Sequence, residues 1–312
     1  MNLYVGVTDN DWFAFLRERR ADEVNFWQPG GTQAFRALRP GEPFLFKLKH
    51  PHNHIAGGGF FVHHTFLPLS VAWETFGLAN GLPDYASFAR RIHGYRRQRG
   101  DDGPNPVIGC VALAQTFFLD EADWVAAPAS WSQSIVSGKR YDLRADAEMR
   151  GLWQRVLDRT TALDLSSPAG LGATAEAPGG YTLPFLMRGR IGQGAFRALV
   201  TDAYGRRCAL SGERTLPVLQ ASHIRPFATE GPNRVTNGLL LRADLHVLFD
   251  RGYLTVTPEH RVEVSKRIRE EFENGRDYYA FDGEPLRVLP ARTADRPEAA
   301  FLTYHNEHVY RP

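Results

Sequence analysis

Hydrophobic positions repeat with a period of two at residues 43–49, PFLFKLK, which predicts a strand with one buried face. Longer apolar runs at 57–69 and 107–119 predict two central strands. Apolar spacing also predicts four helices, at residues 12–19, 70–81, 85–98 and 149–157. The second of these has Ser70 as its N-terminal cap and stops at a glycine. Strands interleaved with short helices indicate a mixed α+β fold or a small barrel for this half.

The second half has a different order of elements. Residues 196–204 carry apolar side chains along one helical face, which ends at Gly205. The pattern after this helix predicts a strand, a loop, a second strand, a helix and a hairpin. These elements are expected at 216–224, 225–236, 238–241, from about 243 onward, and 252–265.

One segment separates the two halves. SSPAGLGATAEAPGG, residues 166–180, consists largely of Ser, Pro, Ala and Gly and has no apolar period. Such a composition is typical of a flexible linker. We therefore expect a domain at 1–165, a linker at 166–184 and a second domain at 185–312.

Composition places the chain among globular proteins, because 43% of its 312 residues are hydrophobic and 23% are charged. Its apolar runs are well under the roughly 20 residues that a spanning helix needs. The N-terminal MNLYVGVTDNDWF has no pattern of a signal peptide. Two distant cysteines exclude a disulfide framework and fit a reducing compartment. The expectation is a cytoplasmic protein that does not contact a membrane.

The net charge of +2 says little about partners, but the charges are unevenly distributed. Residues 185–270 contain 14 Arg or Lys against 8 Asp or Glu, nearly all of the basic ones arginine. Arginine suits phosphate because its planar group donates two parallel hydrogen bonds. A genome that favours arginine everywhere is the alternative explanation. The candidate phosphate contacts are Arg190, Arg197 and Arg225.

The candidate chemistry lies in SHIRPFATEGPNRVTNGLLLRADLHVLFDRG, residues 222–252. A neutral histidine at a strand end, His223, can act as a general base. His246 and Asp250 are four residues apart, so they share one face of the predicted helix and can converge on one ion. Asn237, which lies between His223 and His246 in the sequence, can bond the loop backbone and fix the distance from base to ion. Phosphodiester hydrolysis requires these parts: an activated water and a cation that stabilises charge.

The end of this stretch, NGLLLRADLHVLFDRG, matches every fixed position of NGLxLxxxxHxxFDxG, and residues 208–252 resemble the ββα-metal fold of the HNH nucleases. The upstream RIGQGAFR and CALSG also resemble this branch. The resemblance implies that His223 is the general base, Asn237 the structural asparagine and His246 a metal ligand. Asp250 stands where many HNH enzymes place a further ligand.

Two departures from the HNH pattern bear on the metal. Many HNH enzymes have Asp or His directly before the base, whereas this chain has Ser222, a poor ligand. Coordination would then rest on His246, Asp250 and waters, which suits Mg²⁺ or Mn²⁺, although histidine also accepts Zn²⁺ or Ni²⁺. Some HNH proteins carry a structural zinc on two CxxC motifs, but here Cys208 is followed by Ser211 in place of the second cysteine and there is no other cysteine pair. No structural zinc is therefore expected.

Aromatic residues are frequent in the first half, and Trp27 within EVNFWQPGG is expected on a turn. Aromatics on loops around a small barrel can stack on a flipped base. The layout FLFKLK, IAGGGFF, LPLSVAWETFG, VIGCVAL resembles, more weakly, the PUA superfamily, whose EVE, YTH-like and SRA members read modified bases. The resemblance implies a PUA-like β-barrel with helices at about 1–145. Its candidate base pocket comprises Asn25, Trp27 and Trp73.

Together the two halves resemble modification-dependent restriction endonucleases. The expected substrate is double-stranded DNA with methylated or hydroxymethylated cytosine, and a homodimer is expected because one HNH site cuts one strand. One alternative is an HNH nuclease of a mobile element or toxin, whose N-terminal domain binds unmodified DNA or a protein. The other is a catalytically dead DNA-binding module, which Ser222 suggests.

Overall fold

The computed structural model describes residues 1–97, 103–132, 134–165, 192–226, 229 and 231–312. The chain divides into two units, Met1–Ala195 and Phe196–Pro312. The linker expected at 166–184 lies outside the described residues, so the domain boundaries at 165 and 185 stay a prediction. No helix in the described ranges combines the length and the apolar character needed to cross a bilayer.

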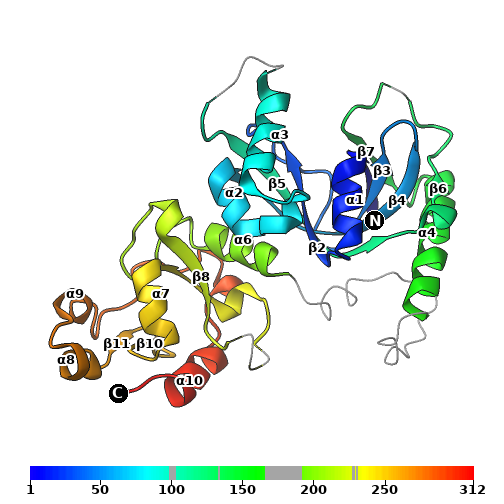
Figure 1. Ribbon diagram of the computed structural model, residues 1–312. Coiled ribbons are helices and arrows are strands. Elements are labelled where there is room, and N and C mark those ends of the chain that lie inside the picture. The colour runs from blue at the N-terminus through cyan, green and yellow to red at the C-terminus, as the bar shows by residue number, and fades with distance from the viewer. Residues whose placement is uncertain (98–102, 133, 166–191, 227–228, 230) are drawn as a thin grey trace. The chain divides into compact units, whose positions relative to one another are not determined.

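The first unit is built on an open seven-stranded sheet with the path β2-β5-β4-β3-β1-β7, and β6 pairs with β4 (Figure 1). Only β1 and β3 are parallel neighbours among the described strands. The strands are β1 Asn2–Thr8, β2 Glu23–Gln28, β3 Pro43–Leu48, β4 His54–Pro68, β5 Val107–Phe118, β6 Val125–Ala126 and β7 Gly138–Asp142.

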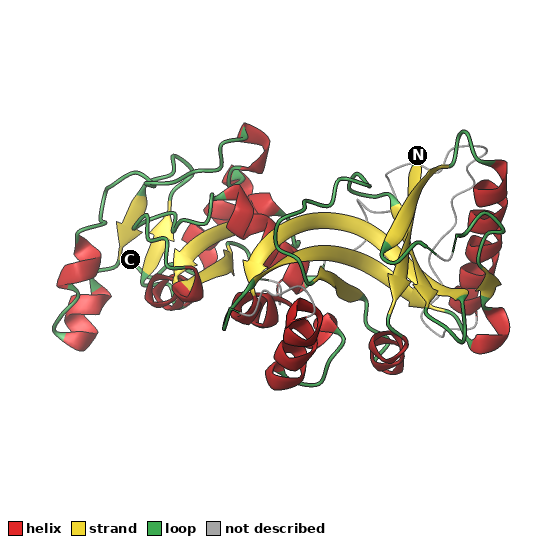
Figure 2. Cartoon of the chain, turned by 90° about the horizontal axis from the view of Figure 1, so that it is seen from above, coloured by secondary structure: helices red, strands yellow, loops and turns green. Residues whose placement is uncertain are grey.

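The expected closed barrel is not what forms. The long strands β4 and β5 curve together (Figure 2), but no pairing among the described residues joins the end strands β2 and β7. Closure requires every strand to pair on both edges. β7 is only 5 residues long and pairs with β1 alone, so the sheet stays open. The fold class is therefore mixed α+β with an open sheet.

Both faces of this sheet are covered, which corrects the one-faced pattern expected at 43–49. Phe44 and Phe46 pack beneath helix α1 (Asn10–Glu18), whereas Leu45 packs in a second cluster on helix α4 (Ala147–Leu165). Even Lys47 is only 5% exposed. Its Nζ donates to Asn53 Oδ1 at 3.1 Å and to the Leu48 carbonyl at 3.2 Å. The lysine that suggested a solvent-exposed face is therefore a buried amine with hydrogen-bond partners.

The helices beside β4 start and stop differently from the prediction. Helix α2 is Leu69–Phe76, so Ser70 lies inside it and Pro68 precedes it, because β4 continues to that proline. The helix ends at Gly77, where φ is +49°, and a 3-10 turn, Gly77–Asn80, follows. Helix α3, Tyr85–Arg97, agrees closely with the expected 85–98.

The second unit has the expected order of strand, loop, strand and helix. Strands β8 (Leu219–His223) and β9 (Gly238–Arg242) are antiparallel, and α7 (Ala243–Asp250) follows directly. β8 starts three residues later than expected because Leu216–Val218, which contains a proline, forms a 3-10 turn. The remaining elements are α6 Gln193–Ala203, whose first three residues fall in the first unit, β10 Leu254–Val256, β11 Val262–Val264, α8 Arg267–Phe272, α9 Arg276–Tyr279 and α10 Ala299–His308.

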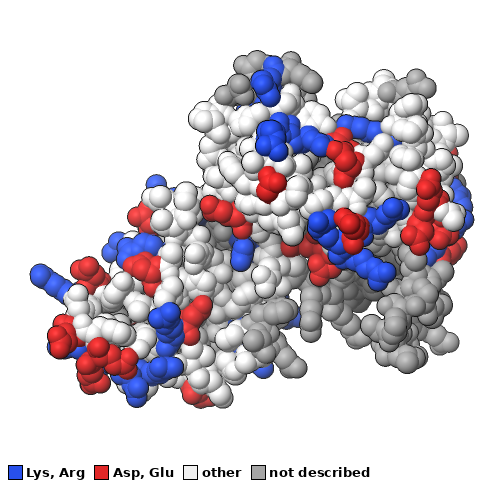
Figure 3. Space-filling view, in the orientation of Figure 1, with Lys and Arg blue, Asp and Glu red and all other residues white. Residues whose placement is uncertain are grey.

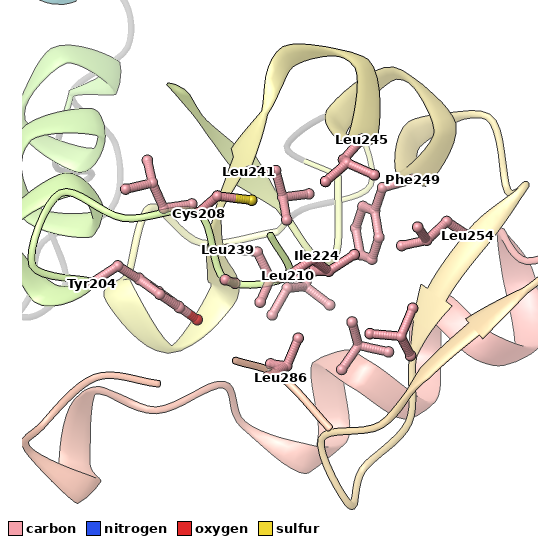
Figure 4. Packing of buried hydrophobic residues seen from close by; sticks show 14 of the residues in the cluster. Tyr204, Cys208, Leu210, Ile224, Leu239, Leu241, Leu245, Phe249, Leu254 and Leu286 are labelled. Carbon is pink, nitrogen blue, oxygen red and sulfur yellow. The ribbon is translucent and has the colours of Figure 1, made fainter. Parts of the chain in front are cut away.

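The core of this unit fixes which side of α7 is available for chemistry. Figure 4 shows Leu245 and Phe249 of α7 directed toward the leucines of β9, and all of them are fully buried. His246 and Asp250 each follow one of these core residues by a single position. A step of one residue turns a helix by about 100°, so this pair lies on a neighbouring, more accessible face.

Candidate active site

His223 ends strand β8, opposite Gly238 of β9. Its ring stacks on Phe196, with centroids 4.0 Å apart and planes at 13°. Its Nε2 lies 2.7 Å from Asn233 Oδ1. A carbonyl oxygen can only accept, so Nε2 carries the proton and the lone pair of the neutral ring lies on Nδ1. The packing and the hydrogen bond together hold the ring in one orientation.

Burial lowers the pKa of His223 from its ordinary value, because desolvation disfavours the charged ring. The Asn233 bond and the charge of Asp250 oppose this effect, whereas His246 and Arg197 reinforce it. Asp250 lies close to the end of β8, because Ser222, the residue before His223, contacts its carboxylate at 3.4 Å. A lowered pKa keeps the imidazole neutral at physiological pH, as a general base must be.

Asn237 is fully buried and holds the loop between the two strands. Its Oδ1 accepts from the Arg225 backbone N–H at 2.8 Å, and its Nδ2 donates to the carbonyls of Arg225 and Pro232, each at 3.0 Å. The side chain uses both ends of its amide on the backbone. It therefore fixes the loop that carries Asn233 and follows His223.

His246 and Asp250 face each other on α7, with 3.2 Å between Nε2 and Oδ2. His246 Nδ1 lies 2.7 Å from Gln220 Oε1, and Ser222 Oγ donates to Asp250 Oδ1 at 3.4 Å. If Gln220 accepts the Nδ1 proton, a neutral His246 directs a lone pair at a carboxylate oxygen. Such a contact is favourable only with a proton or a cation between the two atoms.

The donor set fits a divalent ion held by His246 and Asp250. Two ligands bound at about 2.0–2.2 Å and at right angles are about 3 Å apart, close to the observed separation. No group of three or more His, Cys, Asp or Glu side chains within the described residues could hold a metal. Cys208 is buried, and its Sγ accepts from the N–H groups of Ser211 and Arg242.

Two of the three candidate phosphate contacts lie near this site, and Arg190 is outside the described residues. The charge of Arg197 acts on His223. Arg225 stacks over the Tyr304 ring at 4.8 Å, and its Nε donates to the Thr229 carbonyl at 2.9 Å. Both arginines therefore stay candidates for holding the backbone of a nucleic acid.

The three candidate base-pocket residues of the first unit lie in regular elements. Trp27 is in strand β2, paired with Cys110, and not on the expected turn. Its indole N–H donates to the Asn80 carbonyl at 2.9 Å. Asn25 is fully buried and donates to Asn80 Oδ1 at 2.9 Å. The strand β2 was missed in the sequence because the proline and glycines that follow it are typical of a turn.

Trp27 and Trp73 nevertheless belong to one aromatic group. Phe88 of α3 lies between them, with ring centroids 6.1 Å from Trp27 and 6.0 Å from Trp73. Trp27 also contacts Tyr95 at 5.9 Å. Tyr95 lines an open cleft of about 630 Å³.

The other side chains of this cleft combine apolar and charged groups. In Figure 3, Lys and Arg side chains gather over α3, which contributes two of the lining arginines. The lining includes Asp11, Phe15, Leu82, Arg90 and Arg91.

A family model described as HNH endonuclease matches residues 208–257, the segment that contains β8, β9, α7 and β10. This part of the chain is an HNH endonuclease domain, which implies that the chain is a nuclease, a hydrolase of phosphodiester bonds. HNH endonucleases generally use a divalent metal. The whole sequence matches no curated protein.

Three solved structures share part of their backbone course with this chain. An ASCH protein from Zymomonas mobilis has 7% identity and a TM-score of 0.31, with 50% of this chain and 94% of that chain covered. A variant of it has 9% identity, a TM-score of 0.33 and coverages of 49% and 96%. The modification-dependent TagI restriction endonuclease has 16% identity, a TM-score of 0.30 and coverages of 93% and 76%. Likenesses this distant establish neither fold nor activity here.

Sequence reasoning missed the two amide side chains that contact the histidines, Asn233 and Gln220. Asn233 lies in the loop, where no period indicates its direction. Gln220 could have been found, because it shares a strand face with Ser222 two residues later.

Proposed function

We propose that this nuclease cuts double-stranded DNA carrying a modified cytosine, with His223 as the general base. The observation that carries the hydrolytic part is the orientation of His223. Its Nε2 contacts Asn233, and its pKa is lowered by burial, so a neutral ring has its lone pair on Nδ1. A general base near neutrality contributes about 10²–10⁴-fold to the rate of such a reaction.

The roles of the surrounding residues follow from their contacts. His223 Nδ1 takes the proton of the attacking water, while Asn237 keeps the loop and the base in place. Arg197 and Arg225 bind phosphate oxygens and position the strand without specifying its sequence.

His246 and Asp250 would hold the divalent ion, with Mg²⁺ or Mn²⁺ as the proposed species. The bound ion supplies positive charge for the phosphate and the leaving oxygen. The predicted residence of the protein in the cytoplasm fits either ion.

The modified-base reader is proposed in the first unit, at Asn25, Trp27 and Trp73. Its support is the adjacency of an aromatic group to an open cleft with aromatic and charged walls. Trp27 lies against Tyr95, so a base entering this cleft could stack on Tyr95 while Trp27 holds that ring in position. The arginines that line the cleft suit the neighbouring phosphates.

A homodimer is part of the proposal, because a single HNH site cuts one strand and a double-strand cut needs two sites. Nicked plasmid as the sole product, together with a monomeric mass in light scattering, would contradict this part.

The deciding experiment compares plasmids that contain unmodified, 5-methylated or 5-hydroxymethylated cytosine, each with Mn²⁺ or Mg²⁺. Faster cleavage of a modified plasmid supports the proposal. Equal cleavage of all three would leave a nuclease of the mobile-element or toxin kind. Binding without any cleavage would identify the catalytically dead DNA-binding module.

A further inference from the structure

Two alternate residues of strand β8 contact the two candidate ligands on helix α7. Gln220 Oε1 lies 2.7 Å from His246 Nδ1, and Ser222 Oγ lies 3.4 Å from Asp250 Oδ1. Residues two apart on a strand point to the same face, so both side chains project from β8 in one direction. The strand therefore meets the helix with one polar side chain for each ligand.

The spacing of the two elements makes this pairing possible. Two residues of a strand advance about 6.6–6.8 Å, and four residues of a helix advance about 6 Å. Gln220 and Ser222 can thus match His246 and Asp250 one to one. The register supports the match, because Gln220 pairs with Leu241 and Ser222 with Leu239, shortly before α7 begins.

Each contact constrains one ligand in a different way. If the Gln220 oxygen accepts the Nδ1 proton, the Nε2 lone pair of His246 faces Asp250. The Ser222 hydroxyl occupies Oδ1 of Asp250, so Oδ2 is the oxygen that faces His246. Ser222 is fully buried, whereas the Asp250 side chain is 56% exposed. The serine therefore gives this largely exposed carboxylate a contact with a buried residue.

We propose that Gln220 and Ser222 are positioning residues that prepare His246 and Asp250 to bind one divalent cation. This inference rests on the proposed nuclease function. It gives Ser222 a role other than that of the missing third ligand: the serine holds Asp250 and does not touch the ion. Residues that orient metal ligands in this way typically contribute 10- to 100-fold to affinity, as an order-of-magnitude estimate.

The test uses the full chain freed of metal, with Mn²⁺ affinity measured by calorimetry. Gln220→Leu should weaken Mn²⁺ binding by about 10- to 100-fold, and Gln220→Glu should restore it because the acceptor returns. Ser222→Ala should weaken binding less, by up to about tenfold, and Ser222→Thr should retain the hydroxyl and the affinity. Melting curves verify that each variant is folded.

Matched controls separate positioning from general disturbance. Gln154→Leu removes an exposed glutamine of α4 that donates to Asp158 at 2.9 Å, far along the chain from the nuclease segment. Ser265→Ala removes another fully buried serine of the second unit. Both controls should bind Mn²⁺ as the wild type does.

Nitrogen-15 NMR of His246 in the Mg²⁺-saturated wild type at pH 8.5 gives a readout that a purely structural role would not change. The expected tautomer has its proton on Nδ1, and Gln220→Leu should lose this preference. A wild-type proton on Nε2, or unchanged Mn²⁺ affinity in a folded Gln220→Leu, would overturn the inference while cleavage by the wild type keeps the nuclease proposal. A wild type that neither binds Mn²⁺ nor cuts DNA would remove both.

Discussion

The nuclease segment and the candidate reader pocket differ in how far apart along the chain their parts lie. His223, Asn237, His246 and Asp250 span 28 residues and come together through one hairpin and the helix that follows it. The candidate base contacts come from β2 and α2, which are separated by two further strands. Chemistry built from neighbouring elements can be predicted from spacing, whereas a pocket assembled from distant elements depends on packing that spacing does not express.

The largest expected effect is on the base. His223→Ala should reduce cleavage by about 10²–10⁴-fold, because it removes the proton acceptor while the phosphate contacts remain. Plasmid nicking and DNA binding are measured on the same preparation. His308→Ala, an exposed histidine stacked on Tyr304, serves as control and should cleave normally. Unchanged cleavage by a purified, folded His223→Ala protein would refute the HNH mechanism.

The next effect concerns the cation. His246→Ala or Asp250→Ala should raise the Mn²⁺ concentration for half-maximal cleavage by more than about 100-fold, since each removes a proposed ligand. EDTA should abolish cleavage without unfolding the protein. Asp244→Asn is the matched acidic control on α7, because Arg242 already bonds that carboxylate. A metal titration identical for Asp250→Ala and wild type would place the ion elsewhere.

The reader half of the comparison can be tested with Trp27→Ala, made together with His223→Ala to prevent cleavage. Affinity for modified duplex should fall about 10- to 100-fold, because Trp27 holds the Tyr95 ring on which the base would stack, while binding to unmodified DNA changes little. Trp124→Ala is a close control: its half-buried indole also donates to a backbone carbonyl, that of Leu119 at 3.1 Å. Equal loss for both duplexes would assign Trp27 to the core.

Asn237→Ala should destabilise the second unit by about 1–3 kcal/mol, because it leaves buried backbone groups of the loop without partners. Thermal melting measures this loss, and Asn237→Asp should recover part of it through the acceptor alone. Asn237→Ala should not change the stability of the first unit, which contains the candidate reader pocket. A melting curve unchanged by Asn237→Ala would show that the loop does not depend on this amide.

The smallest effect is a displacement of the pH profile. Burial lowers the pKa of His223. The imidazole therefore becomes protonated, and stops working as a base, only when the pH falls below the range of an ordinary imidazole. The acid limb of kcat/KM should therefore lie at lower pH than for free imidazole. Asn233→Leu removes a contact that raises this pKa and should move the limb further down, whereas Asn233→Asp should move it up. An acid limb above the ordinary imidazole range would contradict the neutral base.

Predictability differed between the two units for a physical reason. The order of β8, β9 and α7 followed from apolar periodicity and from the resemblance, with boundaries in error by at most a few residues. In the first unit, the sequence suggested a turn at β2 and a barrel for the sheet. Both the strand at β2 and the open sheet depend on pairing between strands that lie far apart in the sequence. Lys47 likewise suggested that one face of β3 is exposed to solvent, but that face is buried by the packing on the second side of the sheet.

The sequence by itself predicted the parts of the candidate nuclease site: a histidine at a strand end, an asparagine for the loop and a His–Asp pair four residues apart on a helix. The tertiary structure decided which amide side chain each histidine contacts, Asn233 for His223 and Gln220 for His246. It also decided that the Trp27 indole bonds Asn80 inside the first unit. A hydrogen-bond partner is selected by distances of about 3 Å between side chains, and only the packed chain sets those distances.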